Sequence, residues 1–301
     1  MFWVPLDNQG IRCQTSYMRS DAFQIEHLPE LKEPLLIAGF EGWGNALDVS
    51  RGMVEYLIRK LKAQIFAKID ADLFYRYDEN RPIVKIKDGL LKDISPPGGS
   101  FYAAERSSAG RDLIFLKAIE PTLRWFQFTD ALVSLCKKMG VKTAFLLGSM
   151  YDNVLHTDTV VSASVTHKAL LPRLIENKVT AVSYEGPGAI HSFIQKASKR
   201  KGIECISLWC HCPYYLQGTT HFGLLSYLGS LLASLGGFVF DGTELETTWK
   251  TLNKEIQGII DKSPELQGMI NDLRKAKMKG TWDITRRGDK VIHLEDFIKP
   301  R

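Results

Sequence analysis

The fold is decided by one stretch of the chain, Leu35-Leu36-Ile37-Ala38-Gly39-Phe40-Glu41-Gly42-Trp43-Gly44-Asn45-Ala46. Its first half is apolar without polar alternation, which is typical of a strand buried on both faces of a sheet. A glycine-rich turn follows and leads directly to apolar residues at helical spacing up to Leu61. The side chain of Asn45 is expected to cap this helix. The stretch therefore predicts a strand, a tight turn and a helix, the basic unit of an α/β protein.

The strand and helix pattern repeats along the chain. Gly140 and Gly202 stand where two of the later helices would end. Further strands are expected at residues 64–70, 101–104, 113–118, 143–147, 159–165, 180–184 and 203–209, and helices at 120–139, 167–176 and 189–201. Strands joined by single helices favour a mostly parallel sheet with right-handed crossovers.

One segment breaks this rhythm. Apolar and charged residues alternate over residues 82–87, Asp88-Gly89 is a pair typical of a tight turn, and residues 90–94 resume the strand pattern. The segment predicts a β-hairpin with one solvated face.

The 301 residues are 45% hydrophobic, enough for one large domain or a domain with an appendage. Prolines punctuate residues 1–34, which are expected to be irregular. After residue 240 the sequence becomes a polar helix with sparse apolar positions, and Ser263-Pro264 marks a break between two helices. We therefore predict an α/β domain over residues 1–240 and a helical appendage over residues 241–301.

Charge and hydropathy argue against two classes of protein. The net charge of +5 resides in residues 274–301, which hold nine basic and four acidic residues, so the neutral remainder does not favour a nucleic-acid binder. Residues 222–240 carry no charge, but serines at every fourth position and Gly236-Gly237 favour a buried helix over a membrane span.

The cysteines and the start of the chain indicate a cytoplasmic protein. No secretion signal is visible at the start. The cysteines are odd in number and scattered, which fits a reducing compartment; they are Cys13, Cys136, Cys205, Cys210 and Cys212.

The glycine turn has two interpretations. Gly39, Gly42 and Gly44 resemble a phosphate cradle at the start of a helix. Their spacing matches neither common nucleotide-binding fingerprint, and Glu41 and Asp48 would repel a phosphate. A tight turn that lets helix and sheet pack closely is the favoured interpretation, with a ligand site as the alternative.

Two histidines follow strands. His156 lies in a polar loop beside Asp152 and Asp158, where an open sheet would hold a ligand or an acid–base group, but no nucleophile is paired with it in sequence. His211 lies between two cysteines, yet a second pair of ligands at zinc spacing is missing. We expect a strand end rather than a metal site, and no cofactor.

The turns share one position. In a parallel sheet, four loops would leave the carboxyl ends of strands and gather along one edge. They are Glu41 to Asn45, Ser149 to His156, Glu185-Gly186 with the residues up to Gly188, and Trp209 to Pro213 with His211. That edge is predicted to be either a ligand cleft or an assembly surface.

Several short motifs, in order, resemble the PAC2 (proteasome assembly chaperone 2) family over residues 35–235. They are the run from Phe40 to Ala46, Ile69-Asp70 to Arg81-Pro82, Glu120-Pro121 with Trp125 and Phe128, Leu147 to Met150 with Val154 to Thr157, Tyr184-Glu185-Gly186, and Ser207 to Trp209 with Pro213 to Tyr215. The resemblance implies a three-layer α/β/α sandwich of the nucleoside phosphorylase/hydrolase kind, with a mostly parallel or mixed sheet, and a cytoplasmic homo-oligomer. It also implies, for some members, binding to 20S proteasome α-subunits.

The last three residues of this sequence do not match the motif by which family members bind proteasome α-subunits. Members that dock on proteasome α-rings use a C-terminal hydrophobic-Tyr-any tripeptide, whereas this sequence ends in Lys299-Pro300-Arg301. Residues 289–299 resemble the closing acidic-aromatic segment of prokaryotic members without an assigned role. The family has no established catalytic residues that would correspond to His156 or Glu41.

Two functional hypotheses follow. The first is a non-catalytic assembly or interaction protein, because the sequence offers titratable groups only singly and shows no nucleophile–base pair or metal set. The second is a small-molecule binder, or an enzyme of the hydrolase or phosphorylase type, that uses the strand-end loops. The first is preferred.

Overall fold

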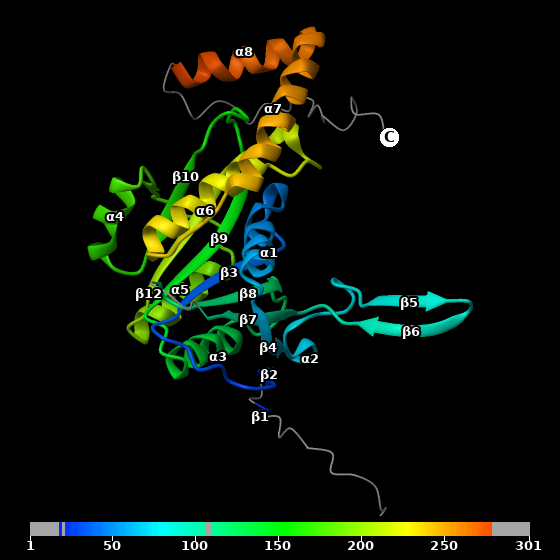
Figure 1. Ribbon diagram of the computed structural model, residues 1–301, viewed down its shortest axis with the longest axis vertical. Helices are drawn as coiled ribbons and strands as arrows, with labels where there is room; N and C mark the ends of the chain where they lie inside the picture. Colours follow the sequence, from blue (N-terminus) through cyan, green and yellow to red (C-terminus); the bar gives the residue numbers. More distant parts are fainter. Residues whose placement is uncertain (1–17, 20–21, 106–109, 279–301) are drawn as a thin grey trace, which may run out of the picture.

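Ten strands form one twisted sheet in the computed structural model, which describes residues 18–19, 22–105 and 110–278 (Figure 1). Their order across the sheet is β1-β2-β4-β7-β8-β3-β9-β12-β10-β11. The bounds are β1 Met18–Arg19, β2 Phe23–Ile25, β3 Leu35–Glu41, β4 Gln64–Ile69, β7 Gly99–Ala104, β8 Leu113–Ile119, β9 Thr143–Asp152, β10 Val161–Val165, β11 Thr180–Ala181 and β12 Glu204–Pro213.

The sheet is mixed, which is one of the two arrangements expected. Its centre, β8-β3-β9-β12, is parallel throughout, as the repeated strand and helix units predict. The strands beyond β8 pair antiparallel, and β10 lies antiparallel to β12. The chain returns from β9 to β10 without a helix, so β10 and its parallel neighbour β11 run opposite to the central strands.

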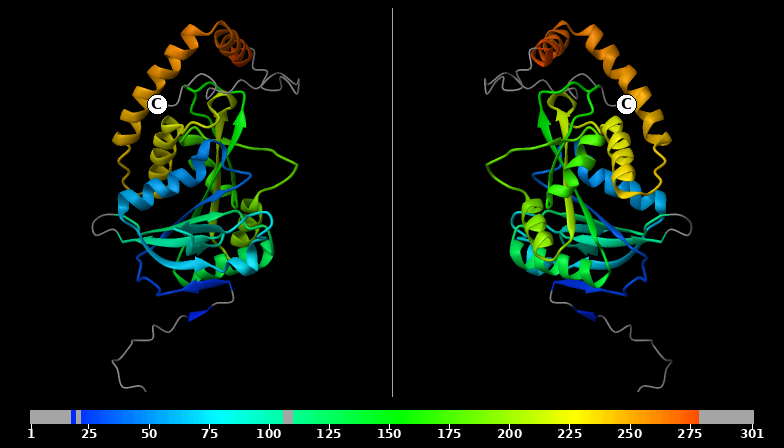
Figure 2. Two further views of the ribbon diagram at one scale, coloured as in Figure 1. Left: turned by 90° about the vertical axis from the view of Figure 1, so that its right-hand side faces the viewer. Right: turned by 90° about the vertical axis from the view of Figure 1, so that its left-hand side faces the viewer.

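Helices cover both faces of this sheet, which confirms the layered α/β architecture (Figures 1 and 2). Helices α1, α6 and α7 contribute to the core on one face, and α3 and α5 to the core on the other. The helices are α1 Val49–Leu61, α2 Ala71–Phe74, α3 Trp125–Lys138, α4 Leu171–Glu176, α5 Ile190–Arg200, α6 Phe222–Gly236, α7 Thr243–Lys262 and α8 Pro264–Met278, with single 3₁₀ turns η1 Ala46–Asp48, η2 Lys168–Leu170 and η3 Tyr214–Leu216.

The helix after the glycine turn begins later than predicted. Leu47 and Asp48 have φ values of 52° and 53°, so the chain turns through η1 before α1 starts at Val49. The Asn45 side chain still serves the first turn of α1, because its Oδ1 accepts a hydrogen bond from the amide N–H of Arg51 at 3.1 Å. Asn45 therefore does not cap α1 as predicted: the residue before this helix is Asp48, and Asn45 lies one 3₁₀ turn earlier.

The predicted hairpin forms, but it has no buried face. Strands β5 (Ile83–Lys87) and β6 (Leu90–Ser95) pair only with each other and extend away from the body as an arm (Figure 1). Every residue of both strands is exposed. We call residues 83–95 the arm; it corrects the expectation of a single solvated face.

The two ends of the chain differ in part from expectation. Residues 23–25, within the segment predicted to be irregular, form β2, and the side chains of Phe23 and Ile25 join the core. The predicted break at Ser263-Pro264 separates α7 from α8. Apolar side chains of both helices belong to the same core as α1 and α6. Cys13 and the segment 279–301 lie outside the described residues.

The uncharged segment folds as expected. Residues 222–236 form α6, whose leucines are buried against the sheet and α1. None of the helices in the described ranges is both long and apolar enough to cross a membrane.

Candidate functional site

Trp209 is the centre of the strand-end region. Its indole lies over two glycines, so a Cβ at Gly44 or Gly148 would come within 2.9 or 2.7 Å of the ring. Trp43 packs edge-to-face on the same indole, with ring centroids 6.1 Å apart. The glycines therefore make room for a side chain, which supports the packing interpretation of the glycine turn.

Alternation along β12 places Ser207, Trp209 and His211 on the face that α5 partly covers. On the neighbouring strands, Ser162 lies directly opposite Trp209 and Met150 directly opposite His211. A patch forms where these strands continue beyond α5. We define the strand-end patch as Trp43, Met150, Asp152, Ser162, Trp209 and His211.

Within this patch, three side chains form a continuous hydrogen-bonded chain. His211 Nδ1 lies 2.7 Å from Oδ2 of Asp152, and His211 Nε2 lies 2.9 Å from Oγ of Ser162. The hydrogen bond from His211 lowers the pKa of Asp152, so the carboxylate is ionised at neutral pH. Because Asp152, His211 and Ser162 come from three separate strands, no sequence spacing could reveal them. The view that titratable groups occur only singly does not hold in the fold.

Glu120 joins the glycine turn to α5. Its Oε1 accepts a hydrogen bond of 2.8 Å from the amide of Ile190, the first residue of α5, and its own amide donates to the carbonyl of Glu41 at 2.7 Å. Burial raises the pKa of the Glu120 carboxyl, whereas the hydrogen bonds from Ile190 and Trp43 oppose that shift. From the sequence, Glu120 was expected only at the start of a helix. Its hydrogen bond to α5 could not be predicted, because the two residues are far apart in the chain.

A second histidine, His191, is fully buried beneath Trp209. Its Nδ1 lies 3.0 Å from Oγ of Ser207, which also accepts a hydrogen bond from the Trp209 indole N–H. Burial lowers the pKa of His191 to about 3, so its ring is neutral and can accept the Ser207 proton. This network anchors the indole from below.

His156, by contrast, lies on the opposite face of the sheet. The Tyr215 hydroxyl accepts a hydrogen bond from the His156 amide at 2.6 Å and lies 2.7 Å from His156 Nδ1. Trp249 of α7 contacts His156 and stacks on His221 at 4.3 Å. Burial lowers the pKa of both histidines, that of His221 to about 4. His156 therefore follows the carboxyl end of β9, as predicted, but on the other face of the sheet from Trp43 and Trp209.

The Glu185-Gly186 loop joins β11 to the start of α5, whose first amide bonds Glu120 beside the glycine turn. It follows β11, which runs opposite to the central strands, and it projects from the body as the yellow-green loop of Figure 2. Within the loop, the Tyr184 hydroxyl donates to the carbonyl of Pro187 at 2.9 Å. Glu185 and Gly186 are exposed.

The cysteines around His211 point away from it. Cys210 and Cys212 are buried on the opposite face, where burial raises the pKa of both thiols, that of Cys210 to about 12. Across the described ranges, no group of three His, Cys, Asp or Glu side chains is arranged to hold a metal ion.

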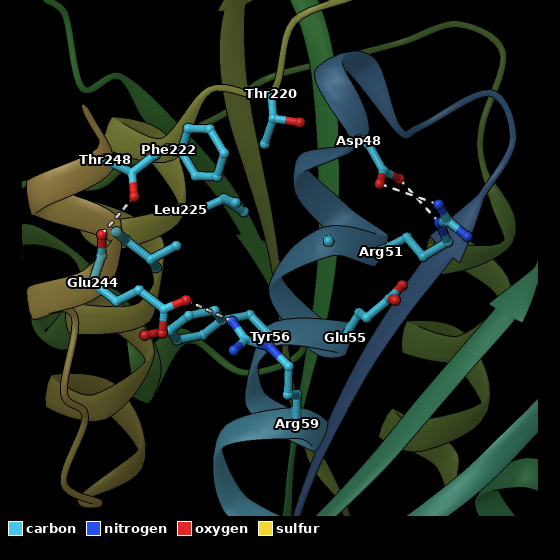
Figure 3. Close-up of a pocket in the computed structure, with 12 residues that line it drawn as sticks. Asp48, Arg51, Glu55, Tyr56, Arg59, Thr220, Phe222, Leu225, Glu244 and Thr248 are labelled. Carbon is cyan, nitrogen blue, oxygen red and sulfur yellow. Dashed lines mark hydrogen bonds and ion pairs between the residues drawn. The ribbon is translucent and has the colours of Figure 1, made fainter. Parts of the chain in front are cut away.

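A separate pocket of about 290 Å³ lies between α1, the start of α6 and the start of α7 (Figure 3). Two ion pairs lie in its wall. Arg51 contacts Asp48 at 3.0 Å within the first turn of α1, and Arg59 contacts Glu244 at 3.0 Å. The second pair links α1 to α7.

The PAC2 family model matches residues 36–260. A PAC2 family protein from Streptomyces avermitilis is 27% identical, with a TM-score of 0.68 over 79% of this chain and 99% of that one. A proteasome-assembly chaperone homologue from Mycobacterium tuberculosis is 25% identical, with a TM-score of 0.69 over 78% and 99%. A Corynebacterium glutamicum protein of unknown function shares the fold, at 21% identity and a TM-score of 0.77 over 86% and 98%. No curated protein matches this chain.

Proposed function

Because the chain belongs to the PAC2 family, we propose that it acts by binding protein chains, as a self-associating assembly protein whose arm docks on a second copy. The relatives from Streptomyces avermitilis and Mycobacterium tuberculosis support a chaperone-like role, the latter being named as a proteasome-assembly chaperone homologue. The observation that carries the proposal is the aliphatic face of the arm.

One face of the hairpin is aliphatic and the other is mixed. Val84 pairs with Ile94 and Ile86 pairs with Leu91, which gives one face four aliphatic side chains. The other face holds the pairs Lys85 with Asp93, Ile83 with Ser95 and Lys87 with Leu90, so charged and polar side chains there separate two aliphatic ones. The four aliphatic side chains are between 54% and 64% exposed, and such a contiguous apolar surface marks an interaction site.

The hairpin also needs a cover to be stable. A two-stranded hairpin alone is at best marginally stable in water, and the described part of this chain does not cover the arm. A second copy of the same chain is a partner that is always available to cover the aliphatic face of the arm. Since a stable interface buries about 800 Å² per partner, the arm must lie along the body of its neighbour and not against another arm alone.

The experiment is a measurement of oligomeric state by sedimentation at micromolar concentration. We expect the wild type to sediment as an oligomer and the double variant Ile86→Lys/Leu91→Lys as a monomer that keeps the circular dichroism spectrum of the folded chain, since both side chains are exposed within one chain. Ile175→Lys is the matched control, because Ile175 is 73% exposed on α4 and should not change the oligomer.

A wild type that stays monomeric would contradict the self-association. Binding to further protein chains is tested separately by capture from a cell extract with the tagged protein. Recovery of the protein itself, without any other chain, would count against an assembly role for other proteins.

A further inference from the structure

Three adjacent strands contribute one side chain each to a hydrogen-bonded chain. Asp152 ends β9, His211 lies near the end of β12, and Ser162 lies on β10. We propose that Ser162, His211 and Asp152 form a nucleophilic site for small uncharged carboxylic esters, an activity beyond the self-association proposed above.

The hydrogen bonds determine which atom carries each proton. A carboxylate can only accept, so the 2.7 Å contact with Asp152 requires a proton on His211 Nδ1. In the neutral ring Nε2 then has a free electron pair, and at 2.9 Å it accepts the hydroxyl proton of Ser162. This is the tautomer in which an imidazole activates a serine.

The strands hold this geometry firmly. The amide of Asn153 donates to the second oxygen of Asp152 at 2.7 Å, and the amide of His211 donates to the carbonyl of Val160 at 3.0 Å. Groups that are fixed by sheet pairing before substrate binds need little reorganisation during the reaction. Asp152 is therefore a positioning residue, while Ser162 and His211 would touch the reacting atoms.

A second serine–histidine pair in the same sheet shows what distinguishes the first. Ser207 and His191 are also in hydrogen-bond contact, but both are buried and the third member of that network is the Trp209 indole. An indole N–H donates and cannot stabilise a protonated imidazole. The pair at His211 has a carboxylate instead, and the side chains of Asp152 and His211 are 32% and 14% exposed.

Exposure and neighbours define the class of substrate. Ser162 is only 4% exposed, so a small acyl group is required to reach its Oγ. Trp209 lies opposite Ser162, and Trp43 beyond it is 64% exposed, which offers a flat apolar surface for the alcohol or phenol part of an ester. The carboxylate of Asp152 disfavours an anionic substrate.

The reaction begins when Ser162 Oγ attacks the ester carbonyl carbon, and His211 Nε2 takes the hydroxyl proton. The bond from the carbonyl carbon to the leaving oxygen breaks, and that oxygen receives the proton from His211 Nε2. Water then attacks the acyl-serine, gives one proton to His211 and releases the carboxylic acid as Ser162 recovers its proton. No oxidant or further reactant is needed.

Two probes test the site on the full chain. A fluorophosphonate reports a reactive serine by its mass on the intact protein, and 4-nitrophenyl acetate reports ester hydrolysis. We expect the label on Ser162 by peptide mapping, and we expect Ser162→Ala to abolish both signals. Ser164→Ala is the matched control: Ser164 lies two residues along the same face of β10, hydrogen-bonded to Gln195, and should leave both signals unchanged.

Asp152→Asn tests the positioning role. It should slow labelling by on the order of 10² to 10⁴, because the amide can hold the imidazole in the wrong tautomer. Asp152→Glu should restore part of the labelling rate, because it again offers a carboxylate to His211 Nδ1. A purely structural role would give Asp152→Asn and Asp152→Glu the same labelling rate.

A folded wild type without label on Ser162, or equal labelling of Ser162→Ala, would overturn the proposal. If Ser162→Ala fails to fold, the site of the label on the wild type still decides. Oligomeric state is measured on the same samples, so failure of the esterase site and failure of self-association remain distinguishable.

Discussion

Gly42 has a φ of +138°, a backbone conformation that side chains rarely adopt, and an added Cβ would lie 3.2 Å from Cβ of Glu120. Gly42→Val should therefore lower the free energy of unfolding by about 1–3 kcal/mol through backbone strain. Urea unfolding followed by circular dichroism measures this change. An unchanged midpoint would mean that the turn tolerates a side chain there.

Gly258, in the C-terminal part of α7, provides the opposite case. An added Cβ at Gly258 meets nothing within 4 Å. Gly258→Ala should raise the free energy of unfolding by up to about 1 kcal/mol, because alanine loses less backbone entropy than glycine in a helix. The same urea titration measures this change. A lower free energy of unfolding for Gly258→Ala would contradict the prediction.

At the scale of elements, α7 is held to the body by few side chains. Ile256 is 1% exposed and belongs to the core that α1 and α6 form with the sheet. Ile256→Ala should cost about 2–5 kcal/mol of local stability by leaving a cavity. Hydrogen exchange should rise over residues 243–278 and stay unchanged in α3, which packs on the opposite face. Uniform acceleration across the whole chain would contradict this local effect.

At the scale of the whole molecule, three buried histidines predict a pH dependence of stability. Burial lowers the pKa of His156, of His191 to about 3 and of His221 to about 4. The unfolded chain titrates these groups near pH 6.5, so below that pH it binds protons that the folded state does not. Stability should accordingly be greatest above about pH 6.5 and fall as the pH drops toward 4.

Each such histidine adds a slope of up to about 1.4 kcal/mol per pH unit within its window. The lowered pKa of Asp152 acts in a lower window, below about pH 4, where its carboxylate becomes protonated. Urea midpoints at pH 7.5, 6 and 5 measure the first effect. His221→Gln should give a shallower slope than the wild type, and equal midpoints at pH 7.5 and 5 would contradict the prediction.

How far the sequence predicts this protein depends on the range of the interactions involved. Local patterns were sufficient for the central strands, the hairpin and the break before Pro264, because hydrophobic periodicity, turn residues and proline act within a few residues. The N-terminal strand β2 was missed because three residues, Phe23 to Ile25, carry almost no periodic signal. The late start of α1 depends on φ values that no residue pattern announced.

By itself, the sequence determined the α/β class, the family resemblance and the presence of the arm, since each is encoded in contiguous residues. Only the tertiary structure decided which side chains meet. Alternation along β12 sent Trp209 and His211 to one face of the sheet, while the loop after β9 placed His156 on the other. Pairing of β9, β12 and β10 then brought Asp152, His211 and Ser162 together, because strand register joins residues that are far apart in the chain.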